Sequence, residues 1–192
     1  MTKATIFGDG NMGTAIAGIL TQGGASVDHL TTADQGAGTV TGDLVILAVP
    51  YPALDAIIAA YGDQLAGKIV VDITNPLDFE TFDSLTVPSD SSAAAELAAK
   101  LPSSRVLKAF NTTFAATLAS KTVGDKPTTV LIAGDDAEAK ATLADAITAG
   151  GVQAVDAGRL NRARELEALG FLQLTLAVRE NISWTGGFAL VN

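Results

Sequence analysis

The sequence has no cysteine and a single histidine, and these shortages exclude several kinds of chemistry. Without a thiol there is neither a disulfide framework nor a thiolate nucleophile. Zinc-dependent alcohol oxidation is not expected, because such sites use several Cys and His ligands. A serine–histidine triad would depend on His29 alone. We therefore expect no metal site and no nucleophilic catalysis.

Two common motifs of catalysis and phosphate binding are absent as well. Tyr51 and Tyr61 are followed four residues later by Asp55 and Leu65, so there is no Tyr-x-x-x-Lys pair. No G-x-x-x-x-G-K-[ST] segment occurs. Oxidation of an alcohol needs a general base, whereas hydride transfer between two rings needs mainly alignment and exclusion of water. The scarcity of titratable groups favours ring-to-ring transfer.

Cationic residues are few, with 12 Lys and Arg against 21 Asp and Glu. The net charge of −9 argues against nucleic acids and anionic membranes as partners. The longest apolar stretch, residues 44–60, contains Pro50, Pro52 and Asp55 and predicts a strand and a helix, not a membrane span. A strand pattern starts within three residues of the N-terminus and leaves no room for a signal peptide, so we expect a cytoplasmic protein.

The first thirty residues carry the most informative motif. Residues 3–7 predict a short buried strand, residues 8–13 read G-x-G-x-x-G, and apolar residues at helical spacing follow. This order is the context in which the motif indicates dinucleotide binding. The first glycine permits a tight turn, the second lets a pyrophosphate approach, and the third lets the helix pack closely. The expected pyrophosphate-binding residues are Gly8, Gly10, Asn11, Met12 and Gly13.

The rest of the chain alternates strand and helix patterns. We expect a helix over 137–148 and a long final helix over 161–181, with strands at 25–30, 44–49, 69–73, 106–110, 129–133 and 152–155. Residues 31–42 read as a loop, so the fold is trimmed after the second strand. The pattern predicts an α/β protein with a Rossmann-type, doubly wound, mostly parallel sheet. We expect residues 1–192 to form a single NAD(P)-binding domain, with a C-terminal helix and tail over 160–192.

Ligands of such sheets bind beyond the carboxyl ends of the strands. Four polar or proline-bearing strand ends are expected to meet there: Gly8 to Gly13, Val49-Pro50, Thr74-Asn75-Pro76 and Asn111-Thr112. Their shared position favours a single site.

At these segments the chain resembles the NADP oxidoreductases that depend on a deazaflavin coenzyme, and also the reductase domains of six-transmembrane ferrireductases. Further matching segments are Asp72 to Pro76, Ala109 to Thr112 and Asp156 to Gly158. The resemblance implies a nicotinamide cofactor along the strand ends and hydride transfer to or from a flavin-like ring. It also implies that the strand ends line the ribose and nicotinamide with Ala48, Val49, Pro50, Asn75 and Pro76, and that Asn111 and Thr112 orient the reacting ring.

The end of the second strand bears on the choice between NADP and NAD. NAD-selective folds place an acid there. Asp28 is a candidate, but the register set by Gly24 and Val27 puts it inside the strand and Thr31 at the end. Thr31 and Thr32 are therefore expected to hold the adenosine ribose or its phosphate. With no acid at the strand end, we expect NADP as cofactor, with NAD possible, although the chain has no Lys or Arg between Lys3 and Lys68.

Several other residues have simpler expected roles. Asp72 is expected to form hydrogen bonds at a strand end and Glu80 to be solvated, and Arg164 and Glu167 are spaced to pair on the helix surface. Trp184 could cover a flat ring, bury a dimer contact or pack in the core.

Together, the sequence predicts an NAD(P)H-dependent oxidoreductase that passes a hydride to a small-molecule acceptor, either a flavin or deazaflavin or another flat redox-active ring. A homodimer is the expected assembly. The alternative is a non-catalytic NADP(H)-binding redox sensor.

Overall fold

The computed structural model describes residues 2–34 and 36–191. Its centre is a seven-stranded sheet in the order β2-β1-β3-β4-β5-β8-β9. Every neighbouring pair of strands is parallel except β5 and β8. The strands are β1 (Lys3–Phe7), β2 (Ser26–Leu30), β3 (Leu44–Leu47), β4 (Ile69–Asp72), β5 (Arg105–Lys108), β8 (Thr129–Gly134) and β9 (Gln153–Gly158). The predicted mostly parallel, Rossmann-type sheet is confirmed.

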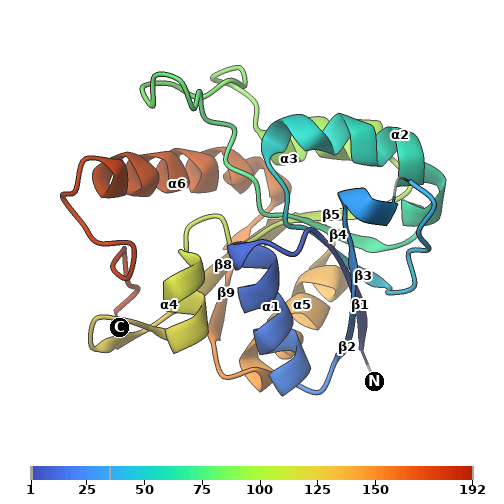
Figure 1. The fold of residues 1–192 in the computed structure, drawn as a ribbon, viewed down its shortest axis with the longest axis horizontal. Coiled ribbons are helices and arrows are strands. Elements are labelled where there is room, and N and C mark those ends of the chain that lie inside the picture. Colours follow the sequence, from blue (N-terminus) through green and yellow to red (C-terminus); the bar gives the residue numbers. More distant parts are fainter. Residues whose placement is uncertain (1, 35, 192) are drawn as a thin grey trace.

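Helices cover both faces of this sheet (Figure 1). In the view of Figure 1, α2 and α3 lie above the sheet, α1, α4 and α5 lie below it, and α6 lies above its far end. The helices are α1 (Asn11–Gln22), α2 (Leu54–Leu65), α3 (Ala93–Lys100), α4 (Ala115–Ser120), α5 (Ala137–Ala149) and α6 (Ala163–Val178). Three short 3-10 turns, η1 (Thr32–Asp34), η2 (Tyr51–Ala53) and η3 (Leu160–Arg162), complete the helical elements of the described chain.

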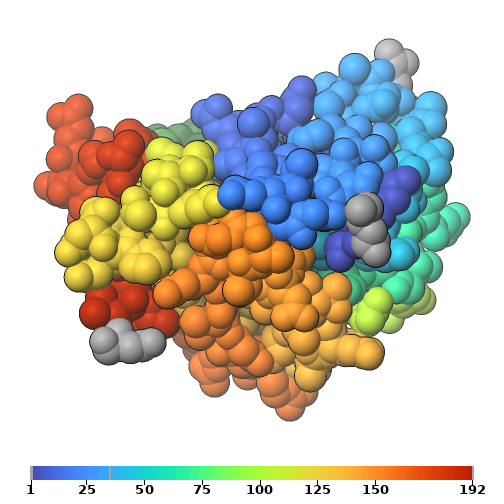
Figure 2. Space-filling view, turned by 90° about the horizontal axis from the view of Figure 1, so that it is seen from below, coloured from blue at the N-terminus to red at the C-terminus, as the bar shows by residue number. Residues whose placement is uncertain are grey.

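Two apolar cores follow from the alternation of side chains along the strands. Ile6 and Ile46 point to the face covered by α1 and α5, whereas Phe7 and Leu47 point to the face covered by α2 and α3. Figure 2 shows the outer surface of the helices that cover the first of these faces. There the segments of α1 (blue) and α5 (orange) adjoin the segment after β5 (yellow). The central strands β3 and β4 are therefore buried on both faces, as the apolar runs of residues 44–49 and 69–73 indicate.

Some elements differ from the prediction. Between β2 and β3 the described chain holds only η1 and irregular backbone, so the predicted trimming is confirmed. The helix α4 and the small hairpin of β6 (Thr122–Val123) and β7 (Lys126–Pro127) were not predicted. The final helix starts at Ala163 and ends at Val178, shorter than expected at both ends. Across the described residues, no helix combines the length and the apolar character that crossing a bilayer requires.

Candidate functional site

The glycine turn between β1 and α1 is held by backbone packing. Gly8 has φ +99°, and a Cβ there would overlap the carbonyl oxygen of Ala48. A Cβ on Gly13 would overlap the carbonyl oxygen of Gly8. The fold itself thus requires glycine at both positions. The ring Nδ1 of His29 lies 3.0 Å from the Gly8 carbonyl oxygen, so the single histidine contacts the turn on its β2 side.

Gly10 is different, because the fold does not require it to be glycine. It has φ −67° at the N-cap of α1, and a Cβ there would meet no atom of the described chain within 4 Å. No described side chain caps α1, and its first turn holds no acid. The free N–H groups and the positive end of the helix dipole therefore face open space. This arrangement suits a phosphate group, and pyrophosphate binding at Gly8 to Gly13 stays a prediction.

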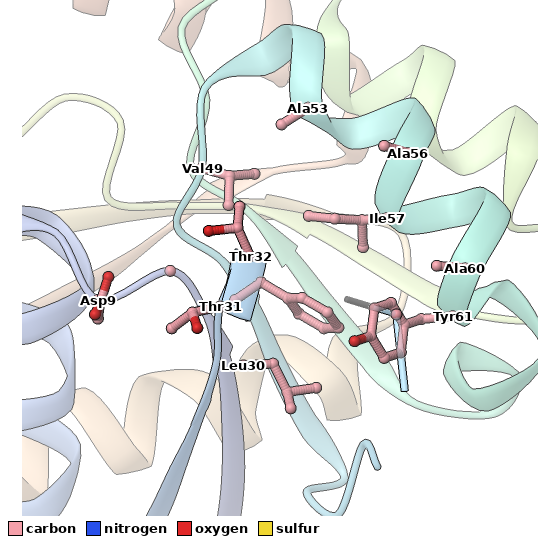
Figure 3. Close-up of a pocket in the computed structure, with 13 residues that line it drawn as sticks. Asp9, Leu30, Thr31, Thr32, Val49, Ala53, Ala56, Ile57, Ala60 and Tyr61 are labelled. Carbon is pink, nitrogen blue, oxygen red and sulfur yellow. The ribbon is translucent and has the colours of Figure 1, made fainter. Parts of the chain in front are cut away.

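A cavity of about 290 Å³, the Tyr61 cavity, lies on one side of the turn (Figure 3). One wall is the apolar surface of α2, and the others are the ends of β1, β2 and β3. The ring of Tyr61 packs edge-on against Phe7 with centroids 5.0 Å apart. The lining residues are Phe7, Gly8, Asp9, Leu30, Thr31, Thr32, Gly36, Val49, Ala53, Ala56, Ile57, Ala60 and Tyr61. Thr31 and Thr32 thus line the same cavity as Gly8 and Asp9 of the glycine turn, and their contact with the adenosine ribose stays a prediction.

The end of β2 contains an acid that the sequence analysis missed. Thr31 directly follows the strand and Asp28 lies within it, as the register predicted. Asp34, however, turns back, and its Oδ2 accepts hydrogen bonds from the backbone N (2.6 Å) and the hydroxyl (3.2 Å) of Thr31. The expectation of a strand end without an acid is therefore wrong. Residues 31–34 have the pattern of a capping box, in which the acid at the third position of a helical turn accepts from the backbone N of the capping Thr, and this is the signal that could have found it.

A second cavity of about 390 Å³, the Trp184 cavity, lies beyond the ends of β4 and β5. The ring of Trp184, half-exposed, packs against Phe114 with centroids 5.0 Å apart. The C-terminal tail therefore contributes an aromatic wall. None of the described side chains that line this cavity is titratable: Asn11, Met12, Ile73, Asn75, Asn111, Thr113, Phe114, Ala115, Ala116, Leu174 and Trp184.

Two asparagines, from the ends of β4 and β5, hold each other in this cavity. The Nδ2 of Asn111 donates to Asn75 Oδ1 (2.9 Å) and to the carbonyl oxygen of Leu166 in α6 (2.8 Å). In return, Asn75 Nδ2 donates to the backbone carbonyl of Asn111 (2.9 Å). The Oδ1 of Asn111 is buried and has no hydrogen-bond partner among the described residues. A bound group with an N–H donor would satisfy it.

The backbone before Asn111 is strained in a way that is common at functional sites. Phe110 is fully buried and has φ +65°, in the left-handed region that non-glycine residues rarely adopt. This conformation turns the chain sharply after β5. The strain is therefore located at the residue that presents Asn111 to the cavity.

The remaining predicted site residues do not lie together in one cavity. Val49 lines the Tyr61 cavity and not the cavity of Asn75. Pro50 is exposed at the start of η2, and Pro76 is buried with its carbonyl accepting from Thr86, and neither lines the Tyr61 cavity or the Trp184 cavity. Thr112 is also buried outside both cavities, and its neighbour Thr113 lines the Trp184 cavity instead.

Beneath the strand ends lies a cluster of three fully buried charged side chains, which we call the Lys108 cluster. The Nζ of Lys108 lies 2.8 Å from Asp72 Oδ2 and 2.8 Å from Glu167 Oε1. Glu167 also accepts from the backbone N of Ala93 (2.9 Å) and Ala94 (3.3 Å) at the start of α3. Burial raises the pKa of Glu167, while the ammonium of Lys108 opposes this shift.

The buried position of Glu167 contradicts the prediction made for this residue. The expected surface pair of Arg164 and Glu167 is wrong, because α6 turns Glu167 into the protein and Arg164 pairs with Glu165. Lys108 was missed altogether, although a lysine inside the apolar strand pattern of residues 106–110 was a usable signal. Asp72 does form hydrogen bonds at a strand end, as predicted, since its Oδ1 accepts from Thr74 N.

Comparison with known proteins finds relatives over most of the chain. Residues 29–76 match the family described as NADP oxidoreductase, coenzyme F420-dependent. An F420-dependent NADP reductase of Methanocaldococcus jannaschii is 34% identical over 174 residues, which cover 88% of this chain and 76% of that protein. Metalloreductase STEAP3 of Rattus norvegicus is 40% identical over 113 residues, 58% of this chain but 22% of that protein. A crystal structure from Arthrobacter sp. FB24, assigned as an F420-dependent NADP reductase, superposes with a TM-score of 0.83 over all of both chains at 26% identity.

Proposed function

The chain belongs to the F420-dependent NADP reductase family, and we propose that it passes a hydride between NADPH and a deazaflavin or similar flat ring. It is accordingly an NADP-dependent oxidoreductase. The proposal about the acceptor rests on the Trp184 cavity, because the described side chains lining it include no acid or base. Transfer between two stacked rings needs alignment and exclusion of water more than a protein acid or base.

The dinucleotide would extend across the glycine turn. We place its pyrophosphate at the N-terminus of α1, where Gly10 leaves room for it. The adenosine half fits the Tyr61 cavity, with its apolar α2 wall and the hydroxyls of Thr31 and Thr32. The nicotinamide half and the acceptor ring fit the Trp184 cavity, where the side chains of Met12 and Trp184 would cover part of the bound rings.

The chemistry that the bound pair supplies is simple. The bound pair would supply the transfer of a hydride from NADPH to the acceptor ring, leaving NADP⁺, and the proton of the reduced ring would come from water. The contribution of the protein is to orient the rings. The buried Oδ1 of Asn111, free of partners among the described residues, would accept a hydrogen bond from the nicotinamide carboxamide or from a ring N–H.

Spectrophotometric assays test this function directly. We expect the purified protein to oxidise NADPH with deazaflavin F420, or with a simpler flavin or deazaflavin, as acceptor. Absence of turnover with deazaflavin, flavin and quinone acceptors, in a protein that binds NADPH tightly, would contradict the proposal and favour a redox sensor.

Asn111→Ala should slow turnover without abolishing it. Without this acceptor a buried donor of the bound ring would stay unpaired, at a cost of about 1–3 kcal/mol, which predicts a roughly 5- to 150-fold lower kcat. Between pH 6 and 8 the rate should change little, because no described side chain lining the Trp184 cavity titrates. Stopped-flow kinetics across this range make the measurement, with the exposed Asn161→Ala as control. A bell-shaped profile would reveal an acid or base that the structure does not identify.

Asp34 should weaken the preference for NADP. Its carboxylate already accepts hydrogen bonds from the N–H and the hydroxyl of Thr31, which are the donors expected to bind the 2′-phosphate. We expect Asp34→Asn to tighten NADPH binding about 5- to 10-fold, since removing a nearby like charge is worth about 1 kcal/mol in a solvated site. Thr31→Asp should have the opposite effect. Calorimetry with NADPH and NADH decides the matter, and an unchanged ratio of dissociation constants in both variants would exclude this role for Asp34.

The assembly and domain organisation remain proposals. Exposed apolar side chains gather on α6 and the tail, at Leu172, Val178, Trp184, Phe188, Leu190 and Val191. We propose that they contribute to a homodimer contact, and that residues 160–192 act as an extension of a single NAD(P)-binding domain. Multi-angle light scattering should give a mass near twice 19.5 kDa, and a monomer at all concentrations would contradict the dimer.

A further inference from the structure

The Lys108 cluster makes no direct contact with the rings in the hydride transfer proposed above, because none of its three side chains lines either cavity. A contribution to the folding stability is also a weak explanation for this cluster. Removing charged groups from water is costly, and buried ion pairs can often be replaced by apolar residues without loss of stability. The position of the cluster indicates another role, because both of its sides adjoin the pair of Asn75 and Asn111.

On the β4 side, the cluster fixes the backbone that leads into Asn75. Lys108 Nζ donates to the carbonyl oxygen of Thr74, and Asp72 Oδ1 accepts from the Thr74 backbone N at 2.8 Å. Both backbone groups of Thr74 are therefore held by charged, fully buried side chains. Charge-assisted hydrogen bonds of this kind are the stronger ones, so the position of Asn75 is well defined.

On the α6 side, the cluster fixes the helix that holds the amide of Asn111. Glu167 follows Leu166, whose carbonyl oxygen accepts from Asn111 Nδ2 at 2.8 Å. Gly170, one turn later, packs so tightly on the pair that a Cβ there would overlap Asn75 Oδ1. The orientation of the Asn111 amide thus depends on where the first two turns of α6 lie, and Glu167 is the ion-paired anchor of those turns.

We propose that Glu167 is a positioning residue, which acts through the buried ion pair with Lys108 to hold Leu166 against Asn111. The amide of Asn111 then keeps its N–H groups toward Asn75 and Leu166, and its Oδ1 stays available to a donor on the bound ring. This inference rests on the proposed hydride transfer for its effect on turnover. Its effect on the Asn111 amide is independent of catalysis.

The test compares Glu167→Gln with Glu165→Gln. Glutamine keeps the volume of Glu167 and an oxygen for the N–H of Ala93, but it turns a donor or a neutral acceptor toward Lys108. Glu165 is a matched control, because it lies on the same helix and forms only exposed ion pairs with Arg162 and Arg164. We expect Glu167→Gln to lower kcat about tenfold while the NADPH dissociation constant stays within about twofold, and Glu165→Gln to change neither.

A double-mutant cycle separates positioning from a general structural role. If Glu167 acts through Asn111, Glu167→Gln should cost little additional activity in the Asn111→Ala background. Equal losses in both backgrounds would mean that Glu167 acts by another route, and the proposal would be wrong.

A spectroscopic readout keeps the inference testable without turnover. In ¹⁵N-labelled protein, the side-chain NH₂ signals of Asn111, identified by their loss in Asn111→Ala, should shift and exchange faster with water in Glu167→Gln and remain unchanged in Glu165→Gln. Unchanged signals in Glu167→Gln would overturn the inference. Failure of the unaltered protein to reduce any acceptor would instead contradict the proposed function, and the NMR comparison would still decide the role of Glu167.

Discussion

Replacing Gly10 by valine should remove NADPH binding while leaving the protein folded. A Cβ at Gly10 meets no described atom within 4 Å, and the backbone there is extended with φ −67° and ψ −173°. The loss of a good N-cap residue costs about 1 kcal/mol, which a domain of this size tolerates. The branched side chain would, however, stand where the pyrophosphate must reach the N–H groups of α1. We expect the dissociation constant of NADPH to rise at least about 100-fold, or about 2.7 kcal/mol.

Gly18→Val is the matched control for this experiment. Gly18 lies in the same helix, and a Cβ there also meets no described atom within 4 Å, but it lines neither the Tyr61 nor the Trp184 cavity. Calorimetry should show normal NADPH affinity for Gly18→Val, and circular dichroism should show native helix content for both variants. Normal affinity in folded Gly10→Val would mean that the dinucleotide does not bind at this turn. Gly8 and Gly13 cannot give such a clean test, because side chains there would collide with backbone.

The features that the sequence predicts well are those encoded locally. The strand, glycine turn and helix over residues 3–22 form one continuous pattern, and β3 is a continuous apolar run. The helix α4 and the hairpin of β6 and β7 were missed because they are short and rich in Ala and Thr, with no clear periodicity. The antiparallel direction of β8 could not be read from its own sequence, since it follows from the connection through α4 and the hairpin.

The site was predicted only in part, for a related reason. That the ends of β4 and β5 meet follows from the parallel topology, so Asn75 and Asn111 could be placed together. The exact partners of their amides depend on α6, which comes from a distant part of the chain. Asp34 reaches Thr31 through a local turn, but only the folded turn shows that its carboxylate points back to the strand end. Long-range contacts and side-chain directions are what the sequence pattern leaves undetermined.

Of the single substitutions proposed here, replacing Lys108 by methionine should lower the free energy of unfolding the most. Methionine fills much of the same volume, but the buried carboxylates of Asp72 and Glu167 would lose their shared cation. Breaking a buried ion pair from one side costs about 3–5 kcal/mol, because an uncompensated buried charge remains. We expect a loss of this size in the free energy of unfolding at pH 8, measured by urea denaturation. A loss below about 1 kcal/mol at that pH would mean that the Lys108 cluster is not charged as the geometry indicates.

The pH dependence of this loss identifies its cause. Burial already raises the pKa of Glu167 above its ordinary value of 4.5, and loss of the Lys108 ammonium, which opposes this shift, should raise the pKa of Glu167 further in the folded state. The folded variant then binds more protons at Glu167 than the unfolded chain above about pH 4.5, so its stability is greatest at acidic pH and falls as the pH rises through the folded pKa of Glu167. Lys108→Met should therefore be closer to the unaltered protein at pH 5 than at pH 8. The triple variant with Asp72→Asn and Glu167→Gln should recover most of the loss at pH 8, because the buried charges are gone. An equal loss at both pH values, with no recovery in the triple variant, would assign the effect of Lys108 to packing and not to charge.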